Sequence, residues 1–192
     1  MAYNRVSKIV GGHTVKIQKN KGMITLLYLA GFLTGILYAN LVSKQYMSTG
    51  IFSSYFLEQY KAVEFIEEEY FFYILKNRMA GFLILILLGS TKIRKIAVMT
   101  SVFWIGISSG ILIVSSIIQL GAKGILLCLI GMTPHFIFYF LSYIVIIWYF
   151  FTYPASRWNT SKTIFTLVMI ASGMVTEVFV NPILMKMFLN TL

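Results

Sequence analysis

Two apolar stretches in the second half of the sequence carry polar side chains at helical spacing. Gly173, Glu177 and Asn181 are four residues apart, so a helix would place them on one side. A second set with similar spacing comprises Gly124, Cys128, Gly131, His135, Tyr139 and Ser142. The two sets could face each other or a shared cavity. We predict that they serve interhelical hydrogen bonding and close packing, with an ion or substrate pathway as the alternative.

The common catalytic arrangements are not supported by these residues. The chain has two histidines, His13 and His135, which do not form the paired spacing of a zinc protease. It has no aspartate, which excludes an aspartyl dyad, and it has neither a Gly-x-Ser-x-Gly motif nor a phosphate-binding loop. The sequence therefore predicts a protein without catalytic residues, metal ligands or cofactors.

The composition indicates that lipid is the solvent for most of the chain. Of the 192 residues 58% are hydrophobic and 11% are charged, whereas a soluble domain has roughly 25% charged residues. The apolar residues also form blocks of about twenty, the length that crosses a hydrocarbon layer. In that setting a buried Glu177 costs roughly 2.5 kcal/mol or more, and it would persist only with a partner or a function.

The apolar blocks predict an all-α, polytopic membrane bundle with about five transmembrane helices. Residues 1–22 would form a basic cytoplasmic segment, and residues 23–192 a single transmembrane domain. The predicted spans are residues 23–43, 71–90, 96–120, 124–151 and 163–189. The fourth contains Pro134, so we expect a kink, a tilt or a re-entrant first half. The last contains Asn181 and Pro182.

Two small-residue motifs predict close contacts between helices. Gly31 and Gly35 lie in the first span, and Gly106 and Gly110 lie in the third. Glycines four residues apart allow helix backbones to approach closely in lipid. Gly131 belongs to the same class of candidate packing positions.

The second span is interrupted by charge near its start. Lys76 and Arg78 stand inside an otherwise apolar stretch. Long basic side chains near a helix end usually extend to the headgroups, so we predict that both do so. The alternative is that Arg78 pairs with Glu177 across the bundle.

Residues 44–70 differ in character from the spans around them. Aromatic and aliphatic side chains recur every three or four residues, and glutamates occupy another face. This pattern predicts an extracytoplasmic amphipathic helix on the membrane surface. The cluster of Glu64, Glu67, Glu68 and Glu69 is either a solvated helix face or a docking surface for a partner.

The positions of the basic residues predict the orientation. The formal net charge of +10 is concentrated before the first span and in the loops after the second and fourth spans. Such loops are typically cytoplasmic, which places the N-terminus inside and the C-terminus outside. The excess charge is therefore a topology signal, and we predict no nucleic-acid partner.

The order of these features resembles the stage II sporulation protein M family of bacterial membrane proteins. The residues that carry the likeness, after a basic N-terminus, are Gly31–Gly35, Phe71–Arg78, Gly124-Ile-Leu-Leu, Gly131-Met-Thr-Pro-His135 and Glu177-Val-Phe-Val-Asn-Pro182.

The resemblance implies a component of the engulfment machinery in the bacterial cytoplasmic membrane. Such a protein would act as a non-enzymatic scaffold that anchors or localises cell-wall hydrolases, or other envelope proteins, at the septal membrane. The alternative is a permease subunit that works with a separate ATPase. The short predicted cytoplasmic loops favour the scaffold. Whether the chain forms a homo-oligomer is left open.

Overall fold

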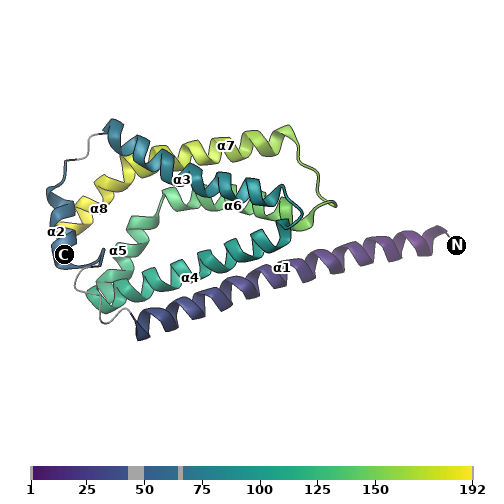
Figure 1. Cartoon of the computed structure of the whole chain (residues 1–192), viewed down its shortest axis with the longest axis horizontal. Helices are drawn as coiled ribbons and strands as arrows, with labels where there is room; N and C mark the ends of the chain where they lie inside the picture. Colours follow the sequence, from purple (N-terminus) through teal and green to yellow (C-terminus); the bar gives the residue numbers. More distant parts are fainter. Residues whose placement is uncertain (1, 43–49, 65–66, 192) are drawn as a thin grey trace.

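The computed structural model describes residues 2–42, 50–64 and 67–191, and all regular structure in these ranges is helical (Figure 1). The helices are α1 (Ala2–Leu41), α2 (Ser54–Ala62), α3 (Glu67–Gly89), α4 (Arg94–Leu120), α5 (Ala122–Met132), α6 (His135–Thr152), α7 (Thr160–Val175) and α8 (Asn181–Leu189). A π-helical turn, η3 (Thr176–Val180), joins α7 to α8.

Within the described residues, five segments are long and apolar enough to cross a membrane. They are Gly22–Leu41, Glu68–Gly89, Arg94–Leu120, His135–Thr152 and Thr160–Leu189. The predicted multi-pass helical bundle is therefore confirmed. The backbone of α1 continues through most of the basic N-terminal segment as the same helix, which the sequence analysis did not anticipate.

The contact between α1 and α4 is made by the two glycine motifs together. Each glycine faces a backbone carbonyl oxygen of the other helix, and a Cβ at any of the four positions would collide with that oxygen. The four pairs are Gly31 with Phe103, Gly35 with Ile107, Gly106 with Tyr28, and Gly110 with Phe32. Because lipid offers no hydrophobic drive for helix association, this close backbone approach is the natural way to hold α1.

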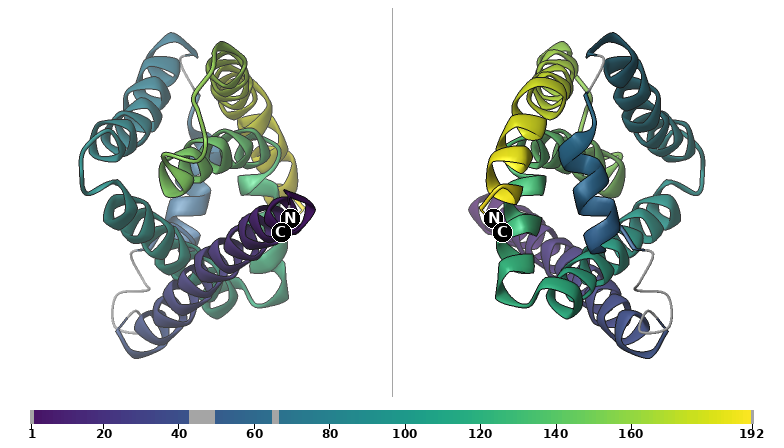
Figure 2. Two further views of the ribbon diagram at one scale, coloured as in Figure 1. Left: turned by 90° about the vertical axis from the view of Figure 1, so that its right-hand side faces the viewer. Right: turned by 90° about the vertical axis from the view of Figure 1, so that its left-hand side faces the viewer.

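The interior has two apolar clusters. The larger one joins α3, α4, α6 and α7 through side chains such as Phe82, Val98, Ile146 and Ile170. The smaller one contains Phe52, Leu57, Leu127 and Leu189. It holds α2, α5 and α8 together at one end of the bundle, and the right-hand view of Figure 2 shows α2 and α8 on the side that faces the viewer.

The predicted span of residues 124–151 is wrong in extent. Pro134 has no backbone N–H to continue the helical ladder, and the chain breaks there into α5 and α6. At 1.5 Å per residue, the 11 residues of α5 extend about 16 Å, too short to cross a membrane alone. α5 lies across the direction of α4 and α6 (Figure 1).

The predicted amphipathic helix over residues 44–70 is also wrong in extent. Only Ser54–Ala62 forms a separate helix, and Val63 is extended. Glu68, Glu69 and Tyr70 already belong to α3. Residues 43–49 and 65–66 lie outside the described part of the chain. The buried Leu57 packs with side chains of α5 and α8, and this contact holds α2 in its place.

The two ends of the bundle carry different charges. The loops 90–93 and 153–159 meet at one end, which we call the basic end, with Lys92, Arg94, Lys95, Arg157 and Lys162 in or beside them. The opposite end, which we call the α2 end, carries α2, the turn at Gly121, the start of α3 and the end of α8.

Candidate functional site

The candidate site is centred on the carboxylate of Glu177, which is 4% exposed. Glu177 lies in η3, where the N–H of Asn181 bonds to the carbonyl of Thr176 and so closes a wider turn than in an α-helix. Pro182 follows directly and lacks the N–H that an α-helical turn would use. Single π turns of this kind are frequent at functional sites. The local sequence thus fixes both the widened turn and the buried carboxylate inside it.

Arg78 of α3 pairs with this carboxylate. Its Nε donates to Oε2 at 2.9 Å and to Oε1 at 3.2 Å, and its Nη2 also donates to Oε1. Snorkelling of Arg78 to the headgroups is therefore wrong, and the alternative, a pairing across the bundle, is what the structure has. Arg78 lies midway along the span Glu68–Gly89, where a partner is worth more than a distant headgroup.

Tyr139 of α6 is the second donor to Glu177. Its hydroxyl donates to Oε2 at 2.8 Å, and the Arg78 guanidinium carbon lies 5.2 Å from the centre of its ring. Gly173 of α7 gives the ring its place, since a Cβ there would lie 2.7 Å from the ring. Glu177 therefore links three helical segments, and its negative charge is balanced within the bundle.

Two further polar atoms near this cluster have no hydrogen-bond partner among the described residues. His135 Nε2 lies 4.0 Å from Glu177 Oε1, too far for a hydrogen bond, and its buried Nδ1 is unpaired. The buried side-chain oxygen of Asn181 is also unpaired. Buried polar groups without partners are uncommon in proteins, so this part of the cluster has unused hydrogen-bonding capacity.

The two polar sets of the sequence analysis thus meet. Tyr139 from one set donates to Glu177 from the other, and His135 lies beside them. Tyr139 belongs to a set that the sequence predicts for interhelical hydrogen bonding, but the sequence did not single it out as the donor to Glu177. Gly173 could have indicated this partner, because a glycine one helical turn before Glu177 leaves room for a large side chain, such as tyrosine, that donates a hydrogen bond to the carboxylate.

The remaining candidate residues lie elsewhere. Gly131 of α5 faces Met185, and Pro134 precedes the first turn of α6. Lys76 is exposed on α3, two residues from Arg78. Glu64, Glu68 and Glu69 are exposed at the α2 end, whereas the side chain of Glu67 lies outside the described part. Across the described residues, no group of three or more His, Cys, Asp or Glu side chains could hold a metal ion.

Helices of this length and apolarity, joined through an ion pair to the buried Glu177, define a multi-pass α-helical membrane protein. Comparisons of the chain with models of protein families, with curated proteins and with solved structures found no match.

Proposed function

We propose that the chain is a non-enzymatic scaffold of the bacterial cytoplasmic membrane that localises an extracytoplasmic partner. The observation that carries the proposal is the free acidic surface at the α2 end. Glu58, Glu64, Glu68 and Glu69 are exposed there, and none of them forms an ion pair with a described residue. An exposed acidic surface with no internal counterion suits a basic protein partner.

The orientation that goes with this proposal follows from the opposite end. Lys92, Arg94, Lys95, Arg157 and Lys162 gather at the basic end, and cytoplasmic loops are the ones enriched in such residues. The basic end would then be cytoplasmic, and the α2 end would face outward. With five spans, the C-terminus lies outside.

The core supports a static role for the bundle. Glu177 is held by Arg78 and Tyr139 from two other helices, so its charge is compensated without any ligand. A compensated pair of this kind stabilises one arrangement of the helices, as a platform requires. The resemblance to the stage II sporulation protein M family suggests a cell-wall hydrolase as the partner, localised during engulfment.

A permease subunit is the second candidate, and one specific observation favours it. His135 Nδ1 and the side-chain oxygen of Asn181 are buried and unpaired near Glu177. A polar solute or ion moving through the bundle would use such groups. In that case a nucleotide-binding ATPase should accompany the chain.

The experiment that separates these functions is a pull-down from native membranes in a mild detergent. The full chain carries an N-terminal tag, and co-purifying proteins are identified by mass spectrometry. A recovered cell-wall hydrolase or other extracytoplasmic envelope protein would support the scaffold, and a recovered ATPase would support the permease.

The docking surface is tested with a charge-neutral variant in the same pull-down. Changing Glu58, Glu64, Glu68 and Glu69 together to glutamine should abolish recovery of the extracytoplasmic partner. The matched control changes the exposed Lys61 and Lys123 at the same end to glutamine and should leave recovery intact. Unchanged recovery with the glutamine variant would contradict the acidic docking surface.

A further inference from the structure

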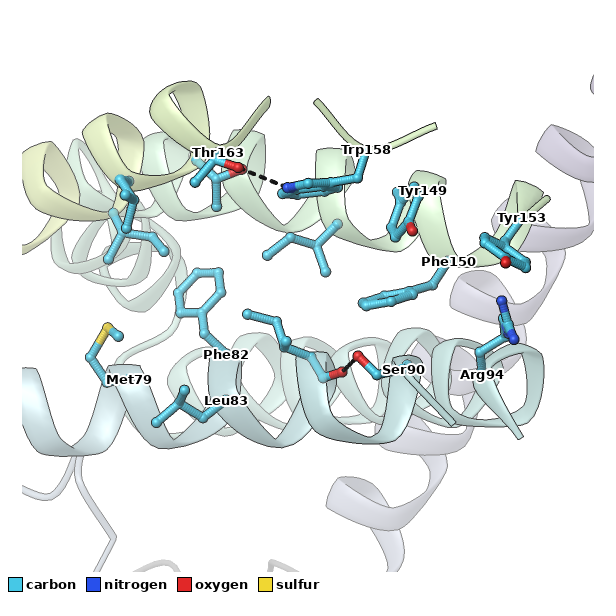
Figure 3. Close-up of a pocket in the computed structure, with 16 residues that line it drawn as sticks. Met79, Phe82, Leu83, Ser90, Arg94, Tyr149, Phe150, Tyr153, Trp158 and Thr163 are labelled. Carbon is cyan, nitrogen blue, oxygen red and sulfur yellow. Dashed lines mark hydrogen bonds between the residues drawn. The ribbon is translucent and has the colours of Figure 1, made fainter. Parts of the chain in front are cut away.

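A cavity of about 550 Å³ lies between α3, α6 and α7, on the basic-end side of the ion pair (Figure 3). Its walls are largely apolar and aromatic, with Phe82, Phe150 and Tyr149 among the lining side chains. Leu83, Ile86 and Leu167 line it as well and are 40 to 58% exposed, so the cavity opens toward the outside of the bundle. Cavities of roughly 300 to 1,000 Å³ are typical of small-molecule sites.

The length of the cavity matches one membrane leaflet. Met79 lies at one end and Arg94 with Tyr153 at the other, as Figure 3 shows. From Met79 to Gly89 the axis of α3 extends about 15 Å at 1.5 Å per residue. That is about half of a 30 Å hydrocarbon layer. An acyl chain of one leaflet would therefore fit the cavity from its mouth to the middle of the membrane.

The mouth of the cavity carries positive charge without any counterion. The guanidinium of Arg94 lies 3.9 Å from the centre of the Tyr153 ring and makes no hydrogen bond or ion pair with a described residue. A guanidinium that stacks on a ring keeps its N–H donors available at its edge. The sequence 89–95 and the sequence 149–163 contain no acidic residue.

Other residues at the mouth are those typical of a membrane interface. The indole N–H of Trp158 donates to Thr163 at 2.8 Å, and Tyr149 packs against the indole ring. Lys162 Nζ lies 5.9 Å from the centre of the Tyr149 ring. Tryptophan and tyrosine are enriched at the level of the lipid headgroups. The mouth therefore lies where a phosphate would be.

A buried hydroxyl provides a second, independent sign of a ligand. Thr166 lines the cavity and is 6% exposed, yet its Oγ1 has no hydrogen-bond partner among the described residues. Threonines in these helices usually donate to a carbonyl of the preceding turn, as Thr152 does to Trp148. Thr166 is about one helical turn farther from the basic end than Thr163, just as the ester groups of a phospholipid lie farther from the aqueous phase than its phosphate.

We propose that this cavity binds an anionic phospholipid of the leaflet at the basic end. One acyl chain occupies the apolar groove, Thr166 donates to an ester oxygen, and Arg94 donates to the phosphate. The site does not involve Glu177 or the acidic surface, so the test of lipid binding is independent of the test of the scaffold function.

The test is native mass spectrometry of the full chain, delipidated in detergent and titrated with phosphatidylglycerol or phosphatidylcholine of identical acyl chains. Phosphatidylglycerol should bind more tightly at a single site. Arg94→Gln should raise the dissociation constant for phosphatidylglycerol about five-fold and leave that for phosphatidylcholine unchanged, since one basic residue contributes on that scale near an anionic lipid. Ile86→Trp should fill the groove and weaken the binding of both lipids. Inorganic phosphate should not compete, because it lacks the acyl chain.

Lys95→Gln is the matched control, because Lys95 is exposed at the same end and does not line the cavity. If Lys95→Gln weakened phosphatidylglycerol as much as Arg94→Gln, the attraction would be diffuse and the proposal would fail. Equal binding of the two lipids by the unchanged protein would also overturn it.

If a variant does not fold, photolabelling of the unchanged protein still tests whether the cavity binds phosphatidylglycerol. In nanodiscs, phosphatidylglycerol with a photoreactive group midway along an acyl chain should label peptides covering residues 79–90 and 163–170. Labelling confined to other parts of the chain would overturn the proposal.

Discussion

Arg78 and Glu177 are 99 residues apart in the sequence, and the guanidinium of the first donates to both carboxylate oxygens of the second. Arg78 comes from the middle of α3, whereas Glu177 comes from the widened turn between α7 and α8. The pair is thus the polar connection between the second span and the last one.

Removing one member of this pair should destabilise the bundle. Glu177→Gln leaves the charge of Arg78, whose side chain is partly exposed, without its counterion, and the loss of a partner for a polar group typically costs about 1 to 3 kcal/mol. The triple change Arg78→Leu, Tyr139→Phe and Glu177→Leu should recover most of the loss, because none of the three side chains then needs a polar partner. Unfolding by SDS in mixed micelles measures the free energy of unfolding of both variants. A triple variant as unstable as the single one would contradict a compensating role.

The Tyr139 hydroxyl should contribute separately from the ion pair. Tyr139→Phe removes the donor to Glu177 while keeping the ring against Gly173, and hydrogen bonds to charged groups are worth roughly 1.5 to 3 kcal/mol. Tyr143→Phe is the control, because the Tyr143 hydroxyl has no hydrogen bond to a described residue while its ring stacks on Phe82. Equal unfolding free energies for the two variants would exclude the hydrogen bond as a stabilising contact.

The seam between α1 and α4 should not tolerate a methyl group. Gly106→Ala places a Cβ against the carbonyl oxygen of Tyr28, and overpacking of this kind typically costs about 1 to 3 kcal/mol. Gly22→Ala on α1 is the control, since a Cβ there meets nothing within 4 Å. Cysteines placed across the seam should crosslink less efficiently in the first variant only. Equal crosslinking of the two variants would show that the seam accommodates the methyl group and would contradict the prediction.

The proposed orientation makes the two ends of the bundle accessible from opposite sides. In a Cys128→Ser background, Ser54→Cys at the α2 end should react with an impermeant maleimide in intact cells. Ser161→Cys at the basic end should react only after permeabilisation. Both serines are exposed, so burial does not decide the result. Labelling of both from one side would mean that the number of spans between them is even.

The spans were predictable because a hydrocarbon layer requires long apolar helices, and the sequence has blocks of the right length. That the two glycine motifs would pair with each other was harder to predict from the sequence. Gly31 and Gly106 each indicate a close contact, but neither motif names its partner.

The ion pair could be named only as an alternative. Whether Arg78 reaches the headgroups or Glu177 depends on the rotation of α3 about its axis, and that rotation is set by packing of Phe82 and Leu85 in the larger core cluster. The break at Pro134 was foreseen as a kink, but a missing N–H does not determine the direction in which α5 leaves α6.

The crossed position of α5 has a consequence for the shape of the membrane around the protein. Ile125, Leu126 and Leu129 are 44 to 56% exposed on a helix that lies across the bundle at the α2 end. The basic end has no comparable helix among the described residues. We therefore expect the protein to occupy more area in the leaflet at the α2 end than in the other leaflet, and to fit best where that leaflet is convex.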